Sequence, residues 1–255
     1  MIRRPPFYRP RPLWLLGAVL VAGVAACDGG DIFAGSGKSV VLERPPAETS
    51  LSMRSDPLPF GQNLLLNPSF DSAVILGTLP VAPGNWRGDL AATVHAEVGI
   101  VPHRGLTMLK FLATGALPGS ATLTSSLWQV VDLVTFSKAI AQGGVQASAG
   151  AWFNRIDAGE LTDRRFDLRL LAFDGSPGDL LARYGSSTWL AEQTAALISA
   201  PNQWQRVGVS MVLPAQTSYV LVEIYASEDV FNDTESPEFA GHYADDMSLM
   251  LRPLN

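Results

Sequence analysis

The sequence has a single cysteine, Cys27, and three histidines in 255 residues. One cysteine cannot form a disulfide within the chain. If Cys27 carries a lipid, as argued below, no thiol remains for a thiolate nucleophile or a zinc site. His95, His103 and His242 are scattered and lack the HExxH spacing of zinc hydrolases. The Gly-x-Ser-x-Gly elbow of serine hydrolases is also absent. The sequence therefore predicts that this protein is not an enzyme.

Basic residues are also scarce, with 18 Lys and Arg against 24 Asp and Glu and a net charge of −6. Four arginines lie in the first twelve residues, so their removal would leave 14 basic residues and a net charge of −10. Binding of phosphates depends on Lys and Arg, so this balance argues against a nucleic-acid partner. The stretch "AGSGKS" does not predict a nucleotide site either, because Ile32 stands where a phosphate-binding loop needs its first glycine.

The chain has one long hydrophobic run, Leu13–Ala26, which follows the basic N-terminus. Its fourteen residues fall short of the roughly 20 that a membrane-spanning helix needs, and the order of basic then apolar residues is typical of a secretory signal. The run ends in "VAAC", which resembles the lipobox of bacterial lipoproteins. That resemblance implies a signal peptide over residues 1–26, a lipid on Cys27, and a location in the bacterial cell envelope, anchored to the membrane.

Residues 27–60 are rich in Gly, Ser, Pro and charge, which predicts a flexible tether. Residues 61–255 are long enough for one well-buried domain. Short segments in this part alternate apolar and polar residues, as in "FDLRLLAF" and "WQRVGVSMVL", and Gly, Pro, Asn and Asp turns separate them. Only residues 133–142, and less clearly 194–199, have a helical pattern. This spacing predicts an all-β domain, an antiparallel sandwich of two sheets.

The order of the motifs in this domain is similar to that of a known superfamily. "NLLLNPSFD" opens the domain, "GNWRGD" follows, "SSLWQVVDL" leads to "GGVQASAGAWFN", and "NQWQRVGVSMVLP" precedes the closing "HYADDMSLML". The succession resembles the galactose-binding-like jelly-roll superfamily, in particular the carbohydrate-binding modules attached to bacterial glycanases. The resemblance implies a jelly-roll β-sandwich and a non-catalytic module that binds glycan or cell-wall polysaccharide.

Asp245 is the misfit in the closing motif. Strict alternation would put Tyr243, Asp245, Met247, Leu249 and Leu251 together on the buried side of a strand, where a lone carboxylate is costly. The resemblance implies a structural calcium ion between the first and last strands, with Asp71 of the opening motif and Asp245 as ligands. Two alternatives stay open from the residues alone. Asp245 could form a salt bridge to an arginine such as Arg87 or Arg104, or it could be solvated, and Asp246 is expected to face solvent.

Aromatic residues are the candidates for contact with a sugar, because sugar rings stack on aromatic faces while polar side chains bind the hydroxyl groups. We expect Trp86 and Trp204 to pack in the core, and Trp152 lies within an alternating strand. The candidate ligand-binding residues are Trp128, Trp189, Tyr184 and Tyr225. If all four were buried, the alternative would gain, namely an envelope adhesion or assembly lipoprotein that uses the same fold to bind a protein partner.

Overall fold

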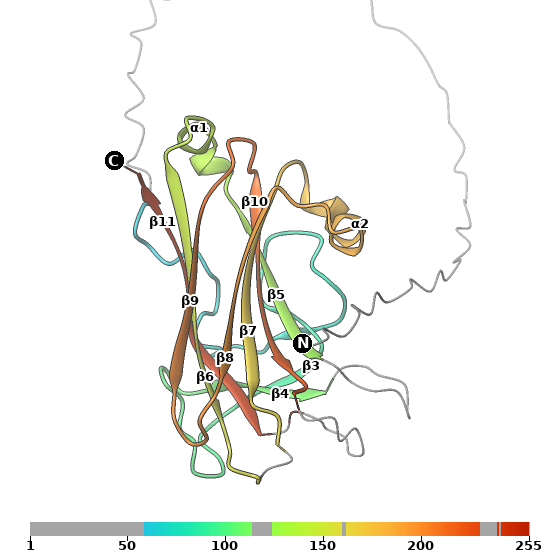
Figure 1. Cartoon of the computed structure of the whole chain (residues 1–255), viewed down its shortest axis with the longest axis vertical. Coiled ribbons are helices and arrows are strands. Elements are labelled where there is room, and N and C mark those ends of the chain that lie inside the picture. Colours follow the sequence, from blue (N-terminus) through green and yellow to red (C-terminus); the bar gives the residue numbers. More distant parts are fainter. Residues whose placement is uncertain (1–58, 114–123, 160–161, 230–238, 240, 255) are drawn as a thin grey trace, which may run out of the picture. The chain divides into compact units, whose positions relative to one another are not determined.

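The computed structural model describes residues 59–113, 124–159, 162–229, 239 and 241–254. These residues form two packed β-sheets (Figure 1). The first sheet has six strands in the order β1-β2-β5-β10-β7-β8, and the second has five in the order β3-β4-β11-β6-β9. Every pairing between these strands is antiparallel except that of β1 with β2. The predicted fold class, a two-sheet jelly-roll β-sandwich, is confirmed.

The strands are β1 (Ile75–Leu76), β2 (Arg87–Gly88), β3 (Leu90–Val94), β4 (Met108–Ala113), β5 (Thr124–Asp132), β6 (Val145–Arg155), β7 (Arg165–Phe173), β8 (Ala191–Ile198), β9 (Gln205–Val212), β10 (Tyr219–Ser227) and β11 (His242–Pro253). Two short helices, α1 (Ser137–Ala141) and α2 (Leu180–Gly185), each follow a 3₁₀ turn, η1 (Val134–Phe136) and η2 (Pro177–Asp179). Both helices lie toward the same end of the sandwich (Figure 1). Residues 194–199 belong to β8 and its end, so the helical alternative for that stretch is wrong.

Alternation along the strands divides the side chains between the two faces of each sheet. In β10, Val220, Val222 and Ile224 pack into the main core between the sheets. Leu221 points the other way and belongs to a second hydrophobic cluster on the outer face of the six-stranded sheet. This outer face is therefore partly apolar and partly polar, and it carries the site described below.

The opening motif of the domain lies beside the last strand, as the resemblance implied. The N–H groups of Gly61 and Leu64 donate to the carbonyls of Leu251 (2.9 Å) and Leu249 (2.8 Å). The Asn63 side chain completes this edge by accepting from Leu249 N–H and donating to the Met247 carbonyl. The first and last segments of the domain are thus joined by backbone pairing.

Strand β11 contains a β-bulge that corrects the predicted alternation. Its register with β6 shifts between Asp245 and Ser248, and Asp246 adopts a positive φ of 46°. An extra residue in one strand moves the following side chains to the other face. Met247 therefore packs into the main core, whereas Tyr243 packs beneath the 94–107 segment in a separate cluster. All five predicted residues are buried, but they do not share one face.

None of the helices in the described ranges has the length and hydrophobicity of a membrane span. The signal peptide, Cys27 and nearly all of the tether, as far as residue 58, lie outside the described residues. The predictions for that part of the chain therefore stay predictions.

Candidate functional site

Five side chains from five strands form a continuous line across the outer face of the six-stranded sheet. The pairing register places Arg87 opposite Trp128, Trp128 opposite Glu223, Glu223 opposite Arg169, and Arg169 opposite Thr194. Residues directly opposite one another in antiparallel strands project from the same face. We call this line, Arg87–Trp128–Glu223–Arg169–Thr194, the polar row. It crosses four interstrand spacings of about 4.8 Å and is therefore about 19 Å long.

The centre of the polar row is an ion pair between a buried carboxylate and a partly buried guanidinium. Arg169 Nη1 donates to Glu223 Oε2 at 3.0 Å, and its Nε donates to Glu192 Oε1 at 2.9 Å. The side chains of Glu223 and Arg169 are only 4% and 17% exposed. The Tyr184 hydroxyl donates to Glu223 Oε1 at 2.8 Å, and Thr194 Oγ1 donates to Glu192 Oε1 at 3.1 Å. These bonds fix both carboxylates and the guanidinium in one arrangement.

Burial and the neighbouring charge act in opposite directions on the pKa of Glu223. Burial raises the pKa of Glu223, while the Arg169 cation, the Tyr184 hydroxyl and the nearby Trp128 indole oppose that rise. The indole Nε1 of Trp128 is buried near the carboxylate, although it makes no hydrogen bond of good geometry within the described residues. Burial, followed by the Glu223 charge, also raises the pKa of Tyr184, which therefore keeps its proton and stays a hydrogen-bond donor.

Aromatic rings surround the Arg169 guanidinium. Its Cζ lies 5.7 Å from the centroid of the Tyr184 ring and 5.5 Å from that of Trp189, within cation–π range. The rings of Trp128 and Tyr184 meet edge to face, with centroids 6.4 Å apart. Tyr225, on the same face of β10 two residues after Glu223, stands opposite Asp167, and burial raises its pKa to about 12. The Trp128, Tyr184, Trp189 and Tyr225 side chains are all partly exposed.

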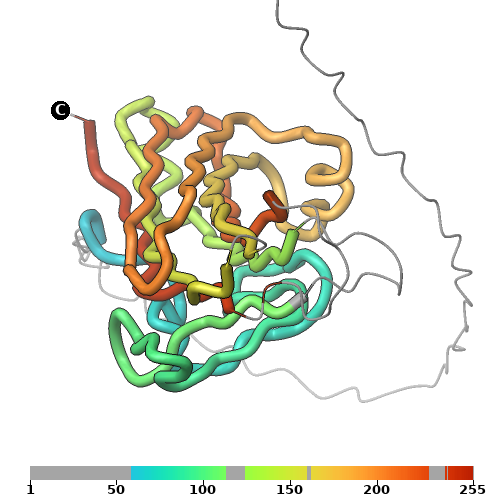
Figure 2. The backbone as a smooth tube through the Cα atoms, turned by 60° about the horizontal axis from the view of Figure 1, so that its bottom comes forward, coloured from blue at the N-terminus to red at the C-terminus, as the bar shows by residue number. Residues whose placement is uncertain are grey.

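The excursion between β7 and β8 delivers two of these rings. Ser176 accepts the N–H of Gly178 at 3.3 Å and Pro177 starts η2, so the turn has both a cap and a fixed first residue. Leu180, fully buried, then anchors α2 in the outer-face cluster. Figure 2 shows this excursion standing off to one side of the strands. Tyr184 is thereby held over the polar row.

The four candidate ligand residues of the sequence analysis therefore lie on one face. Sequence reasoning missed the polar residues among them, namely Arg87, Arg169, Glu192 and Glu223. A signal was present, because Glu223 is a single carboxylate within the apolar strand "YVLVEIYAS", which is the same kind of misfit as Asp245. Its need for a partner pointed to a cation on a neighbouring strand.

The remaining tryptophans in the described residues divide between core and surface. Trp86 is completely buried and packs with Phe70, so the core prediction for it is confirmed. Trp152 and Trp204 are only partly buried and lie on the outer side of the five-stranded sheet. His103 lies between them, stacking on Trp152 at 4.0 Å and meeting Trp204 edge-on at 5.8 Å. Trp204 thus packs against the small cluster of Ile100, Met108 and Tyr243 and not in the main core between the sheets.

The predicted calcium ligands both bind one segment of the chain. Asp245 is fully buried, and its two carboxylate oxygens accept the backbone N–H groups of Arg104 and Asp246 at 2.8 and 2.7 Å. Burial raises the pKa of Asp245 to about 6 despite these bonds. Asp71 accepts the N–H groups of Leu106 (2.8 Å) and Thr107 (3.3 Å). The two carboxylates thus clamp the 104–107 segment from two sides.

This donor set does not fit calcium, which takes six to eight oxygen ligands. The partners of both carboxylates are N–H donors and a serine hydroxyl. Nor do the described residues include a group of three or more His, Cys, Asp or Glu side chains that could hold a metal ion. The salt-bridge alternative for Asp245 is wrong, because the Arg104 guanidinium instead binds Asp246 at 3.3 Å, beside His103. Asp246 is thus paired as well as partly exposed.

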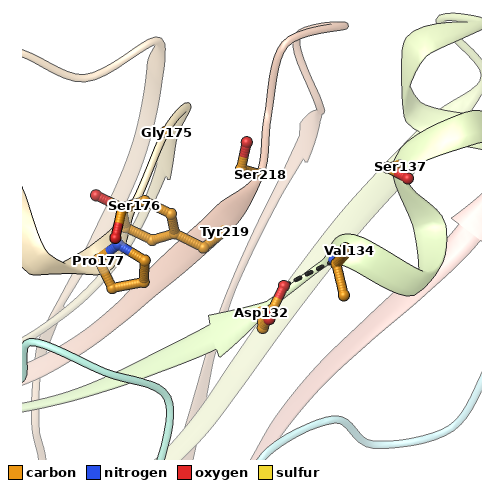
Figure 3. A pocket seen from close by; sticks show the side chains of 8 residues that line it. All are labelled: Asp132, Val134, Ser137, Gly175, Ser176, Pro177, Ser218 and Tyr219. Carbon is orange, nitrogen blue, oxygen red and sulfur yellow. Dashed lines mark hydrogen bonds between the residues drawn. The ribbon is translucent and has the colours of Figure 1, made fainter. Parts of the chain in front are cut away.

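A separate pocket of about 340 Å³ opens at the end of the sandwich that carries the helices (Figure 3). Val134 and Asp132 form one wall and Pro177 the other. Asp132 Oδ1 accepts a hydrogen bond from the Val134 N–H at 2.8 Å. The lining residues are Asp132, Val134, Ser137, Gly175, Ser176, Pro177, Ser218 and Tyr219. Tyr219 precedes Glu223 by four residues on β10, so the pocket is distinct from the polar row.

Comparison with known proteins finds similar shapes but no family. No family model matches the sequence, and no curated protein does. The structure of a family 61 carbohydrate-binding module in complex with β-1,4-galactotriose is 16% identical, with a TM-score of 0.42 over 75% of this chain and 99% of that chain. A family 16 carbohydrate-binding module is 14% identical, with a TM-score of 0.42 over 74% and 99% of the two chains.

A third similar structure is the enzymatically active domain of tailspike protein 4 from bacteriophage CBA120. It is 11% identical, with a TM-score of 0.42, and the match covers 74% of this chain and 21% of that one.

Proposed function

We propose that this protein is a non-catalytic glycan-binding module, held in the bacterial cell envelope by a lipid on Cys27. The observation that carries the proposal is the polar row, where aromatic rings flank a fixed Glu223–Arg169–Tyr184 network on a partly exposed sheet face. The order of the sequence motifs, which resembles that of carbohydrate-binding modules, supports the same proposal. Burial of all four aromatic candidates would have favoured the adhesion alternative, and all four are partly exposed.

The chemistry of the polar row suits a sugar chain. Pyranose rings present apolar faces that stack on Trp and Tyr, and their hydroxyl groups exchange hydrogen bonds with charged side chains. Trp128 and Tyr184 supply the rings, while Glu192 and Thr194 supply acceptors and donors toward the β8 edge. Since existing hydrogen bonds already hold these groups in place, binding costs little additional ordering.

The proposal contains no bond-breaking step. Glycoside hydrolysis needs two carboxylates on either side of the scissile bond. Glu192 and Glu223 instead bind the same Arg169 guanidinium. Calcium has no part in the proposal either, because the contacts of Asp71 and Asp245 do not suit it.

Affinity electrophoresis of the full chain through gels that contain different polysaccharides tests the binding function. We expect at least one polymer to retard the protein, and we expect Tyr184→Ala and Trp128→Ala to abolish the retardation. Trp204→Ala is the matched control, because this partly buried tryptophan lies on the other sheet. Folded protein that no polymer retards, or equal loss in all three variants, would refute the proposal.

The lipid anchor is tested separately. Mass spectrometry of the N-terminal peptide from membrane fractions should show Cys27 as the first residue, with acyl chains attached. The Cys27→Ser variant should keep its signal peptide and lose the acyl mass. An unmodified Cys27 inside an intact N-terminus would exclude the anchor.

A further inference from the structure

Arg87 occupies the end of the polar row on β2. Strand β2 comes unusually close to β5. A Cβ added at Gly88 would lie only 2.1 Å from the Ser126 carbonyl oxygen, closer than real atoms approach. Glycine at this position therefore permits the pairing that sets Arg87 directly opposite Trp128. Arg87 and Trp128 therefore project from the same face, the one on which we place the glycan, and the Arg87 guanidinium lies close to Gly77.

Arg87 differs from the other arginines of this face in having no acidic partner. Arg165 pairs with Asp167, Arg183 with Asp174, and Arg169 with two glutamates. Within the described residues, Arg87 forms no salt bridge, and its Nε is buried without a hydrogen-bond acceptor.

The nearest acid along the chain, Asp89, follows β2 directly and already accepts a hydrogen bond. Asp89 accepts the backbone N–H of Ser126 at 2.8 Å. A donor without an acceptor is destabilising, so its place in a binding face indicates a ligand group that completes the Arg87 guanidinium.

We propose that Arg87 binds the carboxylate of a uronic acid residue on a glycan whose neighbouring ring stacks on Trp128. This inference rests on the proposed function and names the class of glycan that the polar row selects. A guanidinium presents a planar set of N–H donors that matches the two oxygens of a carboxylate, and the charged hydrogen bonds are stronger than those to a hydroxyl. A neutral sugar would leave the Arg87 charge uncompensated.

The net charge of the whole molecule narrows the class of glycan further. Without the four arginines of the signal, the chain carries a net charge of −10. Such a protein repels a densely charged polyanion, although screening limits that repulsion to about 8 Å at physiological ionic strength. The ligand that fits both observations is a largely neutral polysaccharide with separated uronic acid groups, so that one carboxylate meets one free guanidinium.

The test compares polymers that differ only at the carboxyl group. Glucuronoxylan, xanthan, alginate and polygalacturonan are each used in native form and after chemical reduction of their carboxyl groups to alcohols. Affinity electrophoresis of the full chain measures binding. We expect glucuronoxylan or xanthan, in which the carboxylates are separated, to bind about tenfold or more tightly than its reduced form. Salt should weaken the binding of the native form only.

Two matched variants test whether Arg87 causes the difference in affinity between native and reduced polymers. Arg87→Gln should make the native and reduced polymers bind equally. Arg206→Gln should leave the affinities for the native and the reduced polymer unchanged. Arg206 is the matched control because it is an exposed arginine on the other sheet. Equal binding of native and reduced polymers by the unmodified protein would overturn this inference and leave the proposed function standing. Absence of binding to every native and reduced polymer, by folded protein, would overturn both.

Discussion

The Arg169–Glu223 pair allows a sharp test of how the site is held together. Replacing Arg169 with Met removes the cation and leaves Glu223, whose side chain is 4% exposed, without a counter-charge. Breaking a buried ion pair by removing one partner typically costs about 3–5 kcal/mol. We therefore expect Arg169→Met to lower the free energy of unfolding by about 3–5 kcal/mol at neutral pH. Urea unfolding followed by tryptophan fluorescence measures this change.

The loss should depend on pH in a defined direction. Burial already raises the pKa of Glu223 above its unfolded value of 4.5, and removal of Arg169 raises it further. The folded state then holds a proton that the unfolded state releases, so stability falls as the pH rises from about 4.5 through the folded pKa. The destabilisation by Arg169→Met should consequently be smaller at pH 5 than at pH 8.

Two further variants test whether burial of the Glu223 charge causes the loss of stability. Arg164→Met is the matched control, because Arg164 is 50% exposed and its pair with Asp229 should contribute at most about 1 kcal/mol. The double variant Arg169→Met, Glu223→Gln should recover much of the loss, since no buried charge is left. A cost for Arg169→Met no larger than that of the control, or a double variant as unstable as the sum of its parts, would show that burial of Glu223 is not the dominant effect.

The contacts of Gly88, His242 and the two predicted calcium ligands can be tested in the same way. Gly88→Ala should cost about 1–3 kcal/mol in urea unfolding and weaken glycan retardation, because its Cβ would meet the Ser126 carbonyl at 2.1 Å; an unchanged protein would contradict the close pairing of β2. Burial lowers the pKa of His242 to about 4 from 6.5, so stability should fall by about 3 kcal/mol as the pH drops from 6.5 to 4. His242→Phe should remove that slope in unfolding free energy, and a slope that persists would exclude His242 as its source. EDTA should leave the melting temperature unchanged, whereas a fall of several degrees would establish a calcium site despite the N–H partners of Asp71 and Asp245.

The β-sandwich could be predicted because its signal is local. Alternation within a strand, as in "FDLRLLAF", depends only on which side chains face the core, and turn residues mark where each strand ends. Helix α2 could not be predicted in this way, since its six residues are too few for a helical period to show. Its position depends on the cap at Ser176 and on the burial of Leu180 against the outer face.

The environment of Asp245 shows the limit of alternation. The bulge inserts one residue at Asp246, and the pattern of apolar residues on either side looks the same with or without it. The sequence therefore predicted a buried carboxylate that needs a partner, which is correct. It could not reveal that the partner would be the backbone of Arg104, because a backbone N–H leaves no trace in the identity of a residue.

The polar row shows why the aromatic candidates were found and their charged neighbours were not. Tryptophan and tyrosine can be proposed one at a time, whereas Arg87, Glu223 and Arg169 acquire meaning only from the register that joins three strands far apart in the chain. The same register links stability to binding. Leu180 buries α2 against the outer face, which sets Tyr184 on Glu223 and fixes the carboxylate that pairs with Arg169. A change that loosens this helix should therefore weaken the proposed glycan binding even where the changed residue contacts no sugar.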